Sequence, residues 1–230
     1  KILTQCQNET IMTLCQNKGK DGTCMPAGSV ERTNARKEEI INACEKLYQT
    51  MSFKEITIKE IGNVTSFTRT SIYNYFQTKE EIFLALLKRE YDAWVSDLND
   101  IKKRQEPMDN EQIAAAIAQS LDRRHQLLKI MSMNHYDLEE NSRLELLVEF
   151  KVSYGNSLRT MMALLEKFRP DMDIAKRQEF VYAFFPFMFG IYPYTVVTDK
   201  QKEAMERAGV DYTYSSVYDL TYAAVKKLLE

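Results

Sequence analysis

The chain has 230 residues, a formal net charge of −2 and an apolar fraction of 44%, which suffices for a sizeable core. Seven glycines and five prolines are few for this length, which disfavours β-sandwiches, barrels and glycine-rich nucleotide-binding folds. Plentiful Lys, Glu, Leu, Ala and Met favour helices. We therefore expect an all-α protein.

Residues 1–30 are polar and lack a sustained periodicity, so we expect a flexible leader. Cys6, Cys15 and Cys24 lie in it at a spacing unlike the close CxxC pairs of metal sites. Cys44 lies on an apolar helical face and is expected in the core. We expect no metal site and no cofactor.

No apolar run reaches the roughly 18 to 20 residues that a membrane-spanning helix needs. The first residues also lack the apolar core of a signal peptide. We therefore expect a cytoplasmic protein that does not enter a membrane.

Helical periodicity starts at Thr33 and continues to Tyr48, which predicts a first helix. Thr57 then opens a short helix, with Glu60 at the spacing of a capping box. A turn follows near Thr65-Ser66.

Thr68 is expected to cap a further short helix from Arg69 to about Tyr75. Thr78 is expected to cap a long helix that runs to about Arg104. Beyond it, periodicity predicts helices at about 110–120, 122–136, 139–168, 173–197 and 211–229.

Two short helices joined by a tight turn expose the start of the second helix, which fits the major groove of B-DNA. An ordinary helical pair with a solvated polar face is the alternative that periodicity alone leaves open. The candidate DNA-binding residues are Arg32, Thr57, Thr68, Arg69, Thr70, Ser71, Tyr73, Asn74, Tyr75 and Lys79.

The segment from about Arg32 to Leu87 resembles the DNA-binding domain of the tetracycline-repressor (TetR) family. Its most specific part, Ser71-Ile-Tyr-Asn-Tyr-Phe-Gln-Thr-Lys-Glu-Glu-Ile-Phe83, is similar to the family's Thr-Leu-Tyr-x-Tyr-Phe-x-Ser-Lys-Glu-x-Leu. Thr57-Ile58 and Ile61-Gly62 match the family's Thr-Val and Ile-Ala.

Three departures from the family pattern lie in and after the turn. Thr65-Ser66 replaces Ala-Gly, Phe67 replaces a smaller apolar residue, and Thr70 replaces a frequent Gly. Because a left-handed residue at Ser66 would cost energy, we expect the turn to differ locally from that of the family.

After the expected leader over 1–30, the resemblance implies a helix-turn-helix domain over 31–80 and a helical effector-binding and dimerisation domain over 81–230. It also implies a repressor that a small, partly apolar effector releases from a palindromic double-stranded DNA operator. The expected homodimer would form through the helices at about 173–197 and 211–229.

The effector pocket is predicted from aromatic, methionine and histidine side chains, which suit a small apolar ligand with a few polar groups. Packed core is the alternative for each of them, because such residues at helical spacing often fill cores. The candidates are Trp94, His125, Met131, His135, Phe150, Tyr154 and Tyr182.

Two other classes of function stay open from the sequence. A helical adaptor could keep the motif after losing specific DNA binding, and the altered turn leaves room for it. An enzyme is disfavoured, because the chain has no Ser/His/Asp set, no phosphate loop and no HExxH motif.

Overall fold

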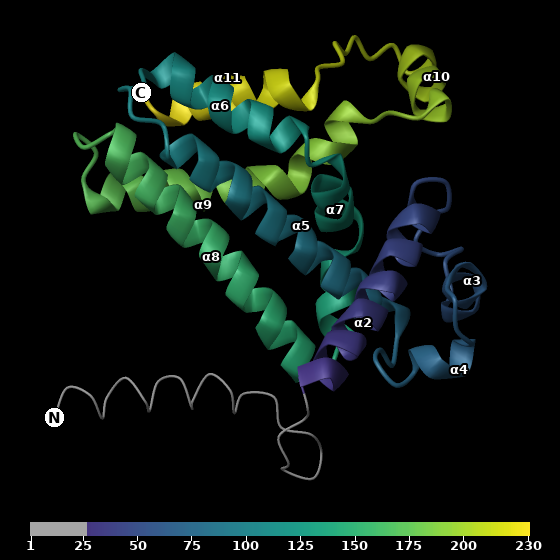
Figure 1. The fold of residues 1–230 in the computed structure, drawn as a ribbon. Coiled ribbons are helices and arrows are strands. Elements are labelled where there is room, and N and C mark those ends of the chain that lie inside the picture. The colour runs from purple at the N-terminus through teal and green to yellow at the C-terminus, as the bar shows by residue number, and fades with distance from the viewer. Residues whose placement is uncertain (1–26) are drawn as a thin grey trace, which may run out of the picture. The chain divides into compact units, whose positions relative to one another are not determined.

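A computed structural model describes residues 27–230, which contain helices and no strand, and this confirms the all-α prediction. The expected leader and Cys6, Cys15 and Cys24 lie outside the described residues, except that 27–30 begin the first helix. The chain divides into two compact units, an N-terminal unit that ends at Gln77 and a C-terminal unit over Thr78–Glu230 (Figure 1).

The N-terminal unit contains α2 (Ala27–Tyr48), α3 (Ile58–Val64) and α4 (Arg69–Ile72). Helix α2 begins earlier than the predicted Thr33. Helix α4 ends before the predicted Tyr75, because the amides of Tyr75 and Phe76 both turn to the carbonyl of Ile72, at 2.8 and 3.0 Å.

The core of the N-terminal unit follows the predicted apolar periodicity. Helix α2 buries Ile40, Ile41, Cys44 and Tyr48, so the predicted core position of Cys44 is confirmed. Helix α2 also buries Ala43, and the other buried apolar residues described in this unit are Ile56 before α3, Ile58 and Ile61 on α3, Ile72 on α4 and Phe76 after α4.

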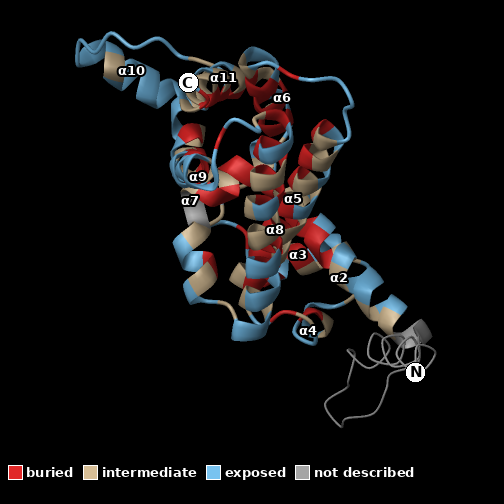
Figure 2. Cartoon of the chain, turned by 90° about the vertical axis from the view of Figure 1, so that its left-hand side faces the viewer, coloured by how far each residue is buried: buried red, intermediate tan, exposed pale blue. Residues whose placement is uncertain are grey.

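The C-terminal unit is built around α5, which packs against α7 and α8, while α6 and α11 lie side by side (Figure 1). The buried residues gather on the facing sides of these helices, whereas α10 buries none (Figure 2). The helices are α5 (Lys79–Lys102), α6 (Asn110–Asp122), α7 (His125–Glu140), α8 (Leu144–Phe168), α9 (Ile174–Thr195), α10 (Asp199–Arg207) and α11 (Val217–Leu228).

The largest differences from the prediction in the C-terminal unit concern the break before α8, helix α10 and the start of α11. The break between α7 and α8 lies at 141–143, later than the predicted break before residue 139. Helix α10 was not predicted, although Thr198 and Gln201 form a capping box at its start. Helix α11 begins at Val217 rather than 211, because Ser216 and Asp219 form a capping box there.

Helix α9 continues through Pro186 and Pro193, both of which lie on its exposed side. In residues 27–230 no single helix has the length and apolar character to cross a membrane. The same residues contain no group of three or more His, Cys, Asp or Glu side chains that could hold a metal ion.

Candidate functional site

Helix α4 divides its side chains between a buried and an exposed side. Ile72 and the following Phe76 are buried, while Arg69, Thr70 and Tyr73 are exposed. A single turn of helix therefore presents a guanidinium and two hydroxyl groups to solvent. Such groups bind phosphate oxygens and base edges in the grooves of DNA.

The turn between α3 and α4 is stabilised by side chains rather than by a left-handed residue. Thr65 Oγ1 lies 3.1 Å from the carbonyl oxygens of both Gly62 and Phe67, which share its single hydrogen. The Ser66 amide donates to Glu39 of α2 at 2.5 Å, and this bond lowers the pKa of the Glu39 carboxyl. No described residue other than glycine has a positive φ, so the turn differs from a left-handed turn as expected.

The caps of the helices agree with the prediction at two of three positions. The hydroxyl of Thr57 accepts the Glu60 amide at 3.4 Å, and that of Thr78 accepts the Glu81 amide at 3.1 Å. The predicted side-chain cap at Thr68 is wrong. In so short a helix the Ser71 amide donates to the Thr68 carbonyl instead, and the two hydroxyls lie 3.1 Å apart.

Arg69 lies along the exposed side of α4. Its Nη2 donates to the Tyr73 hydroxyl at 3.1 Å, and the guanidinium carbon lies 5.8 Å from the centre of that ring. Arg36 stacks in the same way on Phe67, at 5.2 Å. The candidate DNA-binding residue Arg69 thus contacts Tyr73 on the exposed side of α4.

The other candidate DNA-binding residues fall on several elements. Arg32 on α2, Thr57 before α3 and Asn74 after α4 are exposed. Ser71 and Tyr75 are partly buried. Lys79, also partly buried, is the first residue of α5 and belongs to the C-terminal unit.

The C-terminal unit contains an aromatic cluster, which we define as Tyr91, Trp94, His135, Phe150, Tyr154, Phe185 and Phe189. Ring centres lie 5.8 Å apart for Tyr91 and Phe150, and 4.8 Å apart for His135 and Phe189. The Tyr91 hydroxyl donates to the sulfur of Met131 at 3.4 Å. The structure therefore brings together five predicted ligand residues, namely Trp94, Met131, His135, Phe150 and Tyr154.

Sequence reasoning missed Tyr91, Phe185 and Phe189 as members of this cluster. Tyr91 precedes Trp94 by one helical turn, so its spacing could have revealed it. Burial raises the pKa of the Tyr91 phenol.

A polar group lies at the edge of the aromatic cluster. Glu139 Oε1 accepts from His135 Nε2 at 2.8 Å and from Lys151 Nζ at 2.6 Å. The Lys151 ammonium also lies 5.3 Å from the centre of the Phe150 ring. These contacts join α7 to α8.

His135 has an unsatisfied nitrogen. Its Nδ1 is buried and makes no hydrogen bond within the part of the chain that the structure describes. Desolvation lowers the pKa of His135, the Glu139 charge opposes this shift, and the Lys151 charge adds to it. The imidazole is therefore biased toward its neutral form.

The remaining ligand candidates have different surroundings. Trp94 is fully buried and its Nε1 donates to Ser120 Oγ at 3.1 Å, which satisfies its one polar group. His125 is 57% exposed at the start of α7, and Tyr182 is 72% exposed on α9. Neither His125 nor Tyr182 is part of the aromatic cluster.

Two family models match the chain. Residues 40–86 match "Bacterial regulatory proteins, tetR family", and residues 88–216 match "Tetracyclin repressor-like, C-terminal domain". The chain is 24% identical over 97 residues to the uncharacterized HTH-type transcriptional regulator YfiR of Bacillus subtilis (strain 168), a match over 42% of this chain. The chain spans 44% of the length of that relative.

Solved structures share the fold. A putative TetR-family regulator from Mesorhizobium loti has a TM-score of 0.57 at 15% identity, over 86% of this chain and 96% of the other. The fatty acid degradation regulator FadR from Bacillus halodurans has a TM-score of 0.54 at 15% identity, over 84% and 94%. FadR from Bacillus subtilis, solved with stearoyl-CoA, has a TM-score of 0.50 at 17% identity, over 84% and 97%.

Proposed function

Because the chain belongs to the TetR family of transcriptional regulators, we propose that it is a repressor that a small-molecule effector releases from its operator. The observation that carries the DNA-binding part is the exposed side of α4, with Arg69, Thr70 and Tyr73 on one helical turn. TetR-family regulators are generally DNA-binding proteins rather than enzymes. We propose that it acts in the cytoplasm, where its DNA lies.

The DNA-binding residues have two proposed roles. Arg69 reads a base edge after it leaves Tyr73, since arginine is the commonest side chain to bind guanine in the major groove. Tyr75 and Lys79 contact phosphates and contribute affinity without sequence preference. Arg32, Thr57, Thr68, Ser71 and Asn74 complete the proposed interface.

The proposed effector site is the aromatic cluster. His135 uses its Nε2 proton for Glu139, so the buried Nδ1 of the neutral ring offers a lone pair. An apolar molecule with one hydrogen-bond donor, such as a hydroxyl or amide, would satisfy that nitrogen. We keep Trp94, Met131, Phe150 and Tyr154 in this proposed site.

The proposed homodimer forms through α9 and α11. Phe184, Phe185 and Met188 are buried within one chain, so they belong to the core. The outer side of α9 instead exposes Tyr182 and Tyr194, by 72% and 58%. Exposed aromatic side chains of this size are typical of an interface.

The experiment selects an operator from randomised duplex DNA and measures its affinity by gel shift at two salt concentrations. We expect an enriched palindrome bound at nanomolar to micromolar protein, with an affinity that falls as salt rises. Absence of any enriched sequence would contradict the proposal. An intact protein that binds no DNA yet retains a protein partner would favour the helical adaptor.

Effector release is tested on the selected operator with a panel of apolar compounds. The panel pairs alcohols and amides with ketones and esters of the same size, and it includes stearoyl-CoA. We expect release by members that carry a donor, and loss of that preference in His135→Phe. Equal release by both halves of the panel would overturn the proposed role of His135.

A further inference from the structure

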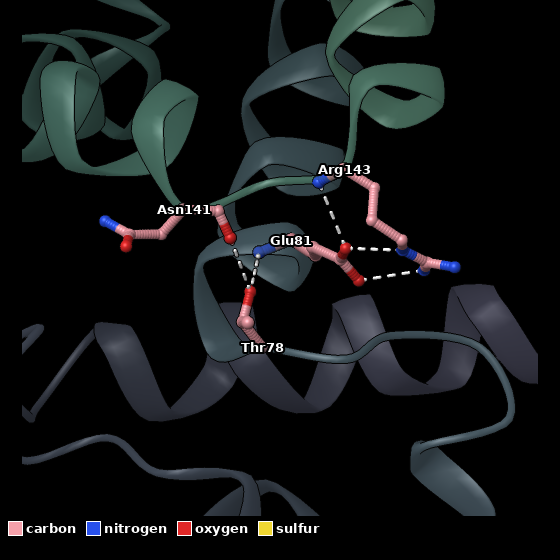
Figure 3. A network of polar contacts seen from close by, with 4 residues as sticks. All are labelled: Thr78, Glu81, Asn141 and Arg143. Carbon is pink, nitrogen blue, oxygen red and sulfur yellow. Dashed lines mark hydrogen bonds and ion pairs between the residues drawn. The ribbon is translucent and has the colours of Figure 1, made fainter.

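The first turn of α5 is bonded to the connection between α7 and α8 by an ion pair whose carboxylate is buried and whose guanidinium is partly exposed (Figure 3). The Glu81 side chain is 1% exposed, and that of Arg143 is 40% exposed. Arg143 donates from Nε to Oε1 at 2.6 Å and from Nη2 to Oε2 at 2.9 Å. Its backbone amide also reaches Oε1, at 3.2 Å, so the carboxylate binds both the side chain and the backbone of Arg143.

Thr78 makes a second tie to the same connection. Its hydroxyl accepts the Glu81 amide at 3.1 Å and donates to the carbonyl of Asn141 at 3.1 Å (Figure 3). Both ends of the three-residue connection are therefore bonded to the first turn of α5.

Glu81 and Arg143 both stand at helix N-termini, where local capping hydrogen bonds would be expected. Thr78 and Glu81 have the spacing of a capping box, in which the glutamate would return to the backbone of the threonine. Glu81 binds Arg143 instead. Arg143 stands at the N-cap of α8 and supplies no side-chain cap there. Helix α5 thus keeps its Thr78 cap without the second bond of a capping box, and α8 has no side-chain cap, while Glu81 and Arg143 bind each other across distant segments.

The position of this tie links two regions of the protein. Helix α7 carries His135 and Glu139, and α8 carries Phe150 and Lys151, so the connection at 141–143 joins the two walls of the proposed effector site. At the other side, Thr78 directly follows Gln77, the last residue of the N-terminal unit. The tie therefore joins the connection between the two walls to the start of the C-terminal unit, directly after the N-terminal unit ends.

We propose that Glu81 and Arg143 are positioning residues that couple effector binding to DNA binding, an inference that rests on the proposed function. A molecule that moves α7 or α8 moves Asn141 and Arg143 with them. The bidentate geometry passes this movement to Glu81, since its hydrogen bonds are short and directional. Movement of the first turn of α5 then moves Thr78, to which the N-terminal unit is covalently joined through Gln77.

If effector binding changes DNA binding, then DNA binding must change the effector site in return, so the operator duplex alone can be used to test the coupling. Amide hydrogen exchange is measured over 144–150 in α8, with and without saturating selected operator duplex. In the wild-type protein we expect the operator to slow exchange of this segment at least about fivefold, within the usual range of coupling between sites.

Three variants separate coupling from folding. Glu81→Met/Arg143→Met removes the buried charge together with its partner, so the protein is expected to fold. Arg143→Lys keeps the positive charge but cannot form the two parallel hydrogen bonds that the guanidinium donates to the carboxylate. Arg124→Met is the matched control, because Arg124 pairs with Asp97 near the other end of α5 at 2.6 Å.

We expect the double variant to bind the operator, but the operator should slow amide exchange over 144–150 in it less than about twofold. The slowing in Arg143→Lys should be intermediate between the double variant and the wild type. The slowing in Arg124→Met should equal that of the wild type. Equal slowing in the double variant and the wild type overturns the inference alone. Absence of slowing in a wild-type protein that binds the operator overturns it as well. A wild-type protein that binds no duplex overturns the proposed function, and the inference falls with it.

Discussion

The two units differ in where their candidate functional side chains lie. The N-terminal unit has its candidate functional groups on the surface, with Arg69, Thr70 and Tyr73 exposed on α4. The C-terminal unit has them inside, where Tyr91, Trp94 and Phe150 are fully buried. Surface groups serve function with little effect on stability, whereas buried groups serve packing and function together.

Substitutions in the two units should therefore have different effects. In the N-terminal unit, a change at the candidate interface should alter DNA affinity and leave unfolding unchanged. In the C-terminal unit, the same kind of change should alter unfolding first.

Arg143→Met is expected to lower the free energy of unfolding of the C-terminal unit by about 3–5 kcal/mol, because it removes the guanidinium that pairs with the buried Glu81 carboxylate. Urea unfolding followed by the fluorescence of Trp94, the only tryptophan, measures the effect. Glu81→Met/Arg143→Met should recover most of the loss. A double variant as unstable as the single one would show that burial of the charge is not the cause.

Ser120→Ala is expected to destabilise the same unit by about 1–3 kcal/mol, since it leaves the buried Trp94 Nε1 without its acceptor. The same urea titration measures it. Gln119→Ala, on the exposed side of the same helix, is the control and should lie within about 0.5 kcal/mol of wild type. Equal effects of the two changes would refute the prediction.

Arg69→Ala should weaken operator binding by about 1–3 kcal/mol and relax the preference at one base position. Its effect on unfolding should stay within about 0.5 kcal/mol, because the side chain is exposed. Lys79→Ala should instead weaken binding to all sequences alike and reduce the salt dependence by about one phosphate contact. Gel shifts against single-base operator variants distinguish these patterns.

Acid should destabilise the C-terminal unit through His135. Because desolvation lowers its folded pKa below the ordinary 6.5, the unfolded chain takes up the proton first as pH falls. The free energy of unfolding should therefore be fully retained above about 6.5 and decline below it, down to the folded pKa. His135→Gln should remove this part of the decline, whereas His125→Gln should keep it.

Gly62→Ala is expected to stabilise the N-terminal unit by about 0.5–1 kcal/mol, because Ala favours the interior of α3. A Cβ at this position would lie 3.4 Å from Arg69 Cα, which is an ordinary contact. Gly209→Ala is the counterpart with the opposite sign, since Gly209 has a φ of 65°. Thermal unfolding of both variants checks the pair.

Much of the N-terminal unit follows from its sequence. Ile40, Ile41, Cys44 and Tyr48 are buried as their spacing predicts, and Thr57 caps its helix as expected. The exposed side of α4 follows from the burial of Ile72 and Phe76 on the other side. These features depend on residues within one or two helical turns, so a local pattern is enough to predict them.

The C-terminal unit is where local patterns were insufficient. The sequence predicted that this unit is helical, but it did not predict the break at 141–143 or helix α10. The capping signal of Thr198 and Gln201 was present in the sequence, and so was that of Ser216 and Asp219. These two capping signals are sufficient to predict where α10 and α11 begin.

Contacts between residues far apart in the sequence depend on how the helices pack. Glu81 and Arg143 are 62 positions apart, and a sequence shows each of them as an ordinary charged residue on a helix end. His135, Phe150 and Phe189 form one cluster because α7, α8 and α9 pack together, which helical spacing within one segment does not specify. Apolar periodicity in the sequence sets which side of a packed helix faces the core, whereas the packing of the helices sets which residues that side meets.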